Sequence, residues 1–203
     1  MRLWPILTAV AIVALVALGA PPMAAQNLIL NGEFDFDVSL WTVSASPGTV
    51  TWSALDHQGG TGSALLASTD PGTLANKAIT QCRPAHAGDT YDTRAWYFIP
   101  SGQSATGYGQ LFVNWFDSDD CLTSPLSGAG AAVVTTLDTW VERQILDQVA
   151  PAGTIAARVF LQLTKNSAGA FQLHADGARL IPHPFFADGF ESGDSSGWSL
   201  AVP

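Results

Sequence analysis

Apolar and polar residues alternate along most of this chain with a period of two. The stretches 91–99, 110–116 and 157–164 each place small or apolar residues on one side and mixed aromatic and polar residues on the other. This period is typical of β-strands that turn one face toward a core. We predict strands in these stretches and further strands in four others: 50–54, 64–67, 78–82 and 137–148.

Turn-forming residues separate the predicted strands. Gln58–Gly62, Asp70–Gly72 and Pro151–Gly153 combine glycine with residues that tolerate tight or left-handed backbone. Regularly spaced strands without long helices predict an all-β fold, a two-sheet antiparallel β-sandwich of the jelly-roll kind. The small-residue segment 124–132 is predicted to be a loop, and Trp41 and Trp140 are predicted to lie in the core.

The first 25 residues have the order of a secretory signal peptide. Arg2 precedes an apolar run that ends in small residues, and we place the cleavage after Ala25. The alternative is an uncleaved membrane anchor, but the apolar run is barely long enough to span a bilayer. Cleavage leaves about 178 residues, enough for one domain, and predicts a secreted or periplasmic protein.

Two segments lie at the ends of the mature chain. Asn27–Val43, with the sequence NLILNGEFDFDVSLWTV, is predicted to be the first strand of the domain. An echo of it, DGFESGDSSGWSLAV, occupies Asp188–Val202 within a predicted C-terminal tail of residues 183–203. The tail is too short to bury a core of its own. A sorting segment, a partial repeat and a strand docked on the domain all stay open.

The charge of the chain is strongly acidic. Without Arg2, 7 basic residues stand against 17 acidic ones. This balance argues against nucleic acid or an anionic membrane as a partner. The carboxylates could instead supply oxygen ligands to a hard cation.

The chain has two cysteines, Cys82 and Cys121. In an oxidising compartment an isolated pair usually forms a disulfide, which we predict here. A pair of free buried thiols is the alternative. Closing a loop of about 40 residues stabilises a fold by roughly 4 kcal/mol in the chain-entropy model.

The order of several segments resembles a known family. After NLILNGEFDFDVSLWTV come AGDTYDTRAWYFIPSG, LFVNWFDSDDC, TLDTWVERQILDQVAPAGTIAARVFLQL and FQLHADGARLI. Together they resemble the galactose-binding-like β-sandwich carbohydrate-binding modules of bacterial polysaccharide-degrading enzymes, over about residues 27–182. The resemblance implies a domain over residues 26–182 that binds a polysaccharide or oligosaccharide on a concave sheet or at loop tips, without catalysis.

The polar and aromatic faces of the predicted strands supply a candidate glycan site. Aromatic rings accept the apolar C–H faces of sugars, while guanidinium and amide groups suit their hydroxyls. These faces also carry Phe160, and our predicted contact residues on them are Arg94, Trp96, Phe112, Asn114, Phe116, Arg158 and Gln162. The alternative is that this face is covered by loops or by the second sheet. A single bulge would also exchange the two faces.

A structural calcium ion is the second candidate. Glu33, Asp35 and Asp176 meet if the first and last strands are neighbours, as they are in the resembled fold. Backbone carbonyls would complete the shell of oxygen ligands that Ca²⁺ takes. The alternative is that these are solvated acids at strand ends. The acidic run Asp117–Asp120 lacks the glycine and glutamate of a calcium loop and is interpreted as a turn.

Nothing in the chain nominates a catalytic site. The four histidines are scattered, and no metalloprotease motif or serine-nucleophile motif is present. We therefore predict a secreted, non-catalytic glycan-binding module. A structural or adhesive envelope domain that contacts other proteins without binding sugar is the alternative, and a small lyase or hydrolase ranks third.

Overall fold

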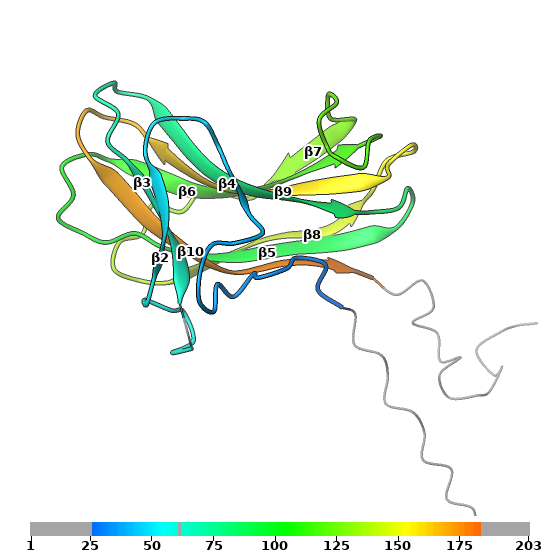
Figure 1. The fold of residues 1–203 in the computed structure, drawn as a ribbon, viewed down its shortest axis with the longest axis horizontal. Helices are drawn as coiled ribbons and strands as arrows, with labels where there is room; N and C mark the ends of the chain where they lie inside the picture. The colour runs from blue at the N-terminus through cyan, green and yellow to red at the C-terminus, as the bar shows by residue number, and fades with distance from the viewer. Residues whose placement is uncertain (1–25, 61, 184–203) are drawn as a thin grey trace, which may run out of the picture. The chain divides into compact units, whose positions relative to one another are not determined.

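The computed structural model describes residues 26–60 and 62–183, and these form two facing antiparallel β-sheets. Figure 1 shows the two layers, with β4, β6, β7 and β9 in one and β5, β8 and β10 in the other. The predicted all-β sandwich is therefore confirmed. None of the described segments is a helix long and apolar enough to cross a membrane.

Each sheet contains five strands. Sheet A has the spatial order β1 (Thr42–Val43), β4 (Ala75–Pro84), β9 (Ala156–Lys165), β6 (Gly107–Phe116) and β7 (Ser127–Gly130). Sheet B has the order β2 (Thr49–Ser53), β3 (Ser63–Ser68), β10 (Phe171–Pro182), β5 (Thr90–Phe98) and β8 (Val141–Val149). The long strands β9 and β10 therefore lie at the centres of their sheets.

The core lies between the two sheets and follows the predicted alternation. Leu111 and Val113 of β6 are fully buried beside Leu161 and Val159 of β9, their direct cross-strand partners. The rings of Tyr91 and Trp115 bring the two layers into contact, with centroids 5.2 Å apart. Burying such side chains removes apolar surface from water, which is the main force that holds the layers together.

The prediction for the two tryptophans was half right. Trp41 is 7% exposed and belongs to the core, where it stacks on Phe34 at 5.4 Å. Trp140 instead packs outside sheet B, against the ring of Phe98. Its neighbour Val141, the first residue of β8, packs against the core, so alternation turns Trp140 to the outer face.

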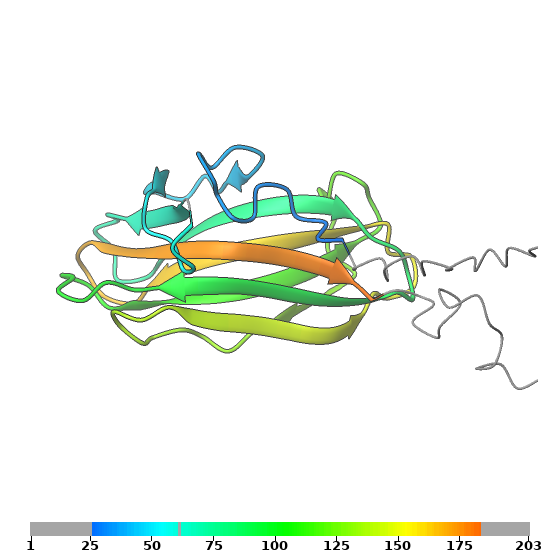
Figure 2. The ribbon, with the colours of Figure 1, turned by 90° about the horizontal axis from the view of Figure 1, so that it is seen from below.

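The predicted first strand over Asn27–Val43 was mostly wrong, because only Thr42 and Val43 form a strand. Left-handed backbone at Asn31 and Phe34, with φ of 49° and 47°, interrupts an extended chain. Two backbone hydrogen bonds join the segment to β10, one at Leu28 and one at Gly32, and between them the side chain of Gln81 bonds both backbone groups of Leu30. Figure 2 shows this segment running beside β10.

The predicted loop over residues 124–132 contains a short strand, β7. The glycines of β7 explain why the sequence predicts a loop here and why a strand can nevertheless form. An added Cβ at Gly128 would lie 2.0 Å from Asn114 Oδ1, and one at Gly130 would lie 2.9 Å from the Phe112 ring. Only glycine leaves room for these β6 side chains, so this strand forms without the alternation of large side chains by which strands were predicted.

Two predicted segments lie outside this description. The predicted signal peptide, residues 1–25, falls wholly outside the described residues, and so does the predicted tail apart from His183. The predicted domain over residues 26–182 contains every strand of the two sheets.

Candidate functional site

The outer face of sheet A carries a ladder of aromatic and amide side chains. Phe160 of β9 pairs directly with Phe112 of β6, and on the same face Gln162 pairs with Gln110 and Arg158 with Asn114. All six are half-buried, which means that each keeps part of its surface open to solvent. Direct cross-strand neighbours stand about 5 Å apart, so the side chains form one continuous patch.

A hollow of about 210 Å³ lies in this patch. It is lined by Phe112, Asn114, Phe160 and Gln162. Two rings and two amides thus converge on one space. The glycines of β7 keep its side open, because residues with side chains at these positions would meet Asn114 and Phe112.

The predicted disulfide between Cys82 and Cys121 is present and closes one end of the patch. Cys82 of β4 is the direct partner of Arg158, and Cys121 lies in the loop after β6. The bridge therefore crosses the N-terminal end of β9, which lies between β4 and β6. Arg158 donates a hydrogen bond to the carbonyl oxygen of Cys121, and its guanidinium lies 5.1 Å from the ring centre of Phe116 and 5.8 Å from that of Phe160.

Phe116 is not an open contact residue as predicted. It points to the same side as Phe112 and Asn114, but it is only 2% exposed. Cys121 and Ala156 pack against it, and Arg158 covers its ring. The loop that carries Cys121 thus buries the ring of Phe116 beside the ladder.

Arg94 and Trp96 lie on a different surface from the other predicted contact residues. Their strand, β5, pairs with β8 and β10 in sheet B, so the two side chains point away from sheet A. The expectation of one shared face was therefore wrong. Alternation along a strand tells which residues share a face of that strand, but not which sheet the strand joins.

The outer face of sheet B is partly covered. His57, from the loop between β2 and β3, stacks on Trp96 with ring centres 5.1 Å apart. Trp140 packs against both His57 and Phe98, at 6.0 and 5.5 Å. Nη2 of Arg94 forms an ion pair with Oδ2 of Asp92, at 3.1 Å. On this face the rings pack on one another and on a loop, whereas the rings and amides of sheet A line a hollow.

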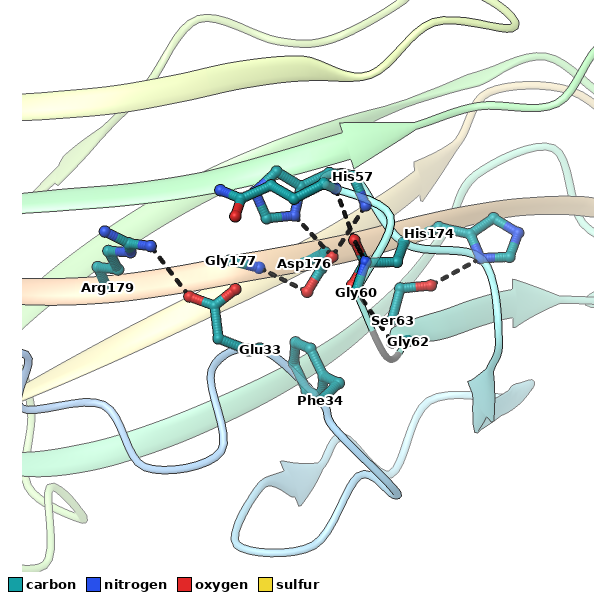
Figure 3. Close-up of polar contacts among 12 residues, drawn as sticks. Glu33, Phe34, His57, Gly60, Gly62, Ser63, His174, Asp176, Gly177 and Arg179 are labelled. Atoms are coloured by element: carbon teal, nitrogen blue, oxygen red, sulfur yellow. Dashed lines mark hydrogen bonds and ion pairs between the residues drawn. The ribbon is translucent and has the colours of Figure 1, made fainter.

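A polar cluster lies at the edge of this covered surface. Glu33 and Asp176, two of the three predicted metal ligands, approach each other together with His57, and one ligand atom from each lies within 4.8 Å of the others. Asp35 does not belong to this cluster. Figure 3 shows the Asp176 carboxylate between His57 and the backbone of Gly177. Calcium binding itself stays a prediction.

Burial sets the electrostatics of this cluster. The side chain of Asp176 is fully buried, and loss of water raises the pKa of its carboxyl group to about 6, although hydrogen bonds from His57 and Gly177 act in the opposite direction. Burial has the opposite effect on the nearby His174, whose charged form is the protonated one: it lowers the pKa of this imidazole, which forms a hydrogen bond with Ser63 at 3.1 Å.

Comparison with solved structures identifies the fold. The chain matches a solved structure described as family 16 carbohydrate-binding module-2 with a TM-score of 0.55 and 21% identity, over 76% of this chain and 99% of that one. It matches TmCBM61, solved with β-1,4-galactotriose, with a TM-score of 0.55 and 17% identity, over 78% of this chain and all of that one. The fold is that of a carbohydrate-binding module.

A third match has a different context. The enzymatically active domain of tailspike protein 4 from bacteriophage CBA120 matches with a TM-score of 0.59 and 17% identity, over 77% of this chain but only 21% of the tailspike chain. This chain therefore spans about a fifth of that protein. No model of a known protein family matches the chain, and no curated protein matches it in sequence.

Two residues of these surfaces escaped sequence analysis. Gln110 was not chosen, although alternation over the predicted strand 110–116 places it on the same face as Phe112; only its pairing with Gln162 depends on strand register. His57 is one of the four scattered histidines, none of which was chosen as a site residue, and its partner Asp176 is 119 residues away in the chain. No local pattern reports a contact of that separation.

Proposed function

We propose that this chain is a non-catalytic glycan-binding module that holds a sugar chain on the outer face of sheet A. The hollow lined by Phe112, Asn114, Phe160 and Gln162 is the observation that carries this proposal. The two rings offer apolar surface for the C–H faces of pyranose rings. The two amides offer both donors and acceptors to sugar hydroxyls.

The charge of the face favours a neutral glycan. Among the side chains that β4, β6, β7 and β9 turn outward, Arg158 is the only charged one, and it is already bonded to Cys121. The whole chain carries a net charge of −9, which disfavours uronate or sulfated polymers. The glycan bound by TmCBM61, β-1,4-galactotriose, is also uncharged and is a suitable first probe.

The same face lacks the groups that glycoside cleavage needs. Hydrolysis with acid–base assistance uses two carboxyl groups on either side of the scissile bond. The outward side chains of the described sheet A strands include no carboxylate. Binding without cleavage is the function that this surface supports best. An extracytoplasmic location fits the disulfide and the predicted signal peptide.

A structural or adhesive role remains the alternative. Several large apolar side chains are exposed away from the ladder, notably Phe36 at 84% and Val149 of β8 at 61%. Such residues are common at surfaces that contact other proteins. In that case the ladder would be a stabilising surface without a sugar ligand.

Retention on insoluble neutral polysaccharides tests the proposal, with titration of β-1,4-galactotriose as a second measurement. We expect Phe160→Ala and Phe112→Ala to weaken retention roughly five- to tenfold, the effect of losing about 1 kcal/mol or slightly more of binding free energy. Phe36→Ala is the matched control, because it removes an exposed ring outside the ladder. Trp96→Ala, on sheet B, should also bind like the wild type.

Retention of the two ladder variants can also contradict the proposal. If both ladder variants fold, as judged by thermal melting, and are retained as well as Phe36→Ala, the outer face of sheet A is not the glycan site. If the wild type is retained by no polysaccharide of a broad neutral panel, the adhesive alternative gains.

A further inference from the structure

The cluster of Glu33, His57 and Asp176 joins three distant parts of the chain. Glu33 comes from the segment before β1, His57 from the loop between β2 and β3, and Asp176 from β10. The sequence predicted a calcium ion here, because acidic residues near the start of the domain and on its last strand meet in the resembled fold. The arrangement of the donors allows that expectation to be tested.

Most of the acceptor capacity of Asp176 is already used. Its Oδ2 accepts a hydrogen bond from the backbone N–H of His57, at 3.2 Å, and lies 2.7 Å from Nδ1 of the same residue, which donates to the carboxylate in the tautomer that carries its proton there. Its Oδ1 accepts one from the N–H of Gly177, at 2.7 Å. A carboxylate has about four lone-pair sites. One site therefore remains for any further partner.

Glu33 also has a cationic partner. Its Oε1 accepts a hydrogen bond from Nη2 of Arg179, at 3.1 Å, and Figure 3 shows this pair beside Asp176. Both side chains are about two-fifths exposed, so the pair is partly screened by water. A guanidinium at this distance nevertheless disfavours a divalent cation close to Glu33.

The imidazole of His57 is held firmly in its position. The side chain is 2% exposed, and its ring stacks on Trp96 and meets the edge of Trp140. Gly177 lies against it, since an added Cβ there would stand 2.9 Å from His57 Cε1. The ring cannot swing aside to admit an ion without disturbing both tryptophans.

This donor set does not fit calcium. Ca²⁺ takes about six to eight oxygen ligands at roughly 2.3–2.6 Å. Here an imidazole nitrogen lies beside Asp176 at hydrogen-bonding distance, and the carboxylates are bonded by N–H groups of His57, Gly177 and Arg179. We infer that the His57 imidazole takes the place of a calcium ion in this cluster, so that N–H groups rather than a metal tie the two ends of the domain together.

Calcium titration of the wild-type protein is the direct test. We expect no binding heat in calorimetry with CaCl₂, and the same melting midpoint in millimolar Ca²⁺ as in excess EDTA. A ligand that binds only the folded state raises the midpoint by mass action, so a real calcium site would be visible in either measurement. A midpoint that rises by several degrees with Ca²⁺ would overturn the inference.

Substitution of the imidazole gives the converse test. His57→Asp brings a third carboxylate to Glu33 and Asp176, so its midpoint should rise with Ca²⁺, and Glu33→Gln in the same variant should reduce that rise. His86→Ala is the control, because His86 is an exposed histidine elsewhere. A folded His57→Asp variant as indifferent to Ca²⁺ as the wild type would contradict the inference. If that variant does not fold, the wild-type titration still decides.

Discussion

Single residues set the geometry of both surfaces of this domain. On sheet A, Phe112 and Phe160 share a hollow with two amides, while Arg158 is fixed by the Cys121 carbonyl and two rings. Holding a side chain in its bound orientation lowers the entropy lost on binding. On sheet B, His57 covers Trp96 and bonds Asp176. The two surfaces differ because their residues have different neighbours, although both lie on outward faces of strands.

Gly177 offers a test at this scale. Its φ is 57°, and an added Cβ would lie 2.9 Å from both the His57 and Trp96 rings. Gly177→Ala should therefore destabilise the fold by about 2 kcal/mol or more, combining left-handed backbone strain with crowding. Gly88→Ala isolates the backbone effect, because φ is 86° there and no atom lies within 4 Å.

Chemical denaturation of the two glycine variants measures the difference. Gly88→Ala should cost about 1 kcal/mol. Equal losses in both variants would mean that His57 and Trp96 are not packed against Gly177 as described.

At the scale of elements, the disulfide connects two strands across a third. Cys82 lies on β4, Cys121 follows β6, and β9 runs between these strands. The bridge also carries the carbonyl that holds Arg158. It therefore supports the end of the ladder as well as the fold. The strand predictions were most accurate for such long, paired elements and failed where side chains replaced a ladder, as at Leu30, or where glycines formed one, as in β7.

Replacing both cysteines by serine should lower the free energy of unfolding by about 4 kcal/mol, because the bridge closes a loop with a sequence separation of 39. Glycan retention, measured well below the melting midpoint, should fall as well, since the bridge no longer fixes the backbone carbonyl that holds Arg158. Unfolding in urea gives the first quantity and polysaccharide retention the second. Unchanged retention in the folded variant would show that the bridge stabilises the domain without shaping its face.

At the scale of the whole molecule, the negative charge predicts how binding responds to salt. The chain has a formal net charge of −9, and the described strands of sheet A turn one charged side chain outward, Arg158, which already donates a hydrogen bond to the Cys121 carbonyl. Stacking and neutral hydrogen bonds depend little on ionic strength, whereas attraction between charges is screened. Retention on a neutral polysaccharide should therefore be the same in low and high salt.

A polyanion supplies the control for this prediction. Retention on a uronate polymer should be negligible at low salt, because the net charge repels it. Strong, salt-sensitive retention on that polymer would mean that the ligand is anionic and that Arg158 is free to bind it.

Local patterns were enough to predict the sandwich, the buried sides of its long strands and the disulfide pair. Alternation of side chains follows from the geometry of an extended backbone, so any strand reveals its two faces without knowledge of its neighbours. Pairing of strands is decided by contacts between distant residues. Only the tertiary structure placed β5 beside β10 instead of β6, separating Trp96 from Phe160, and brought His57 to Asp176 across 119 residues.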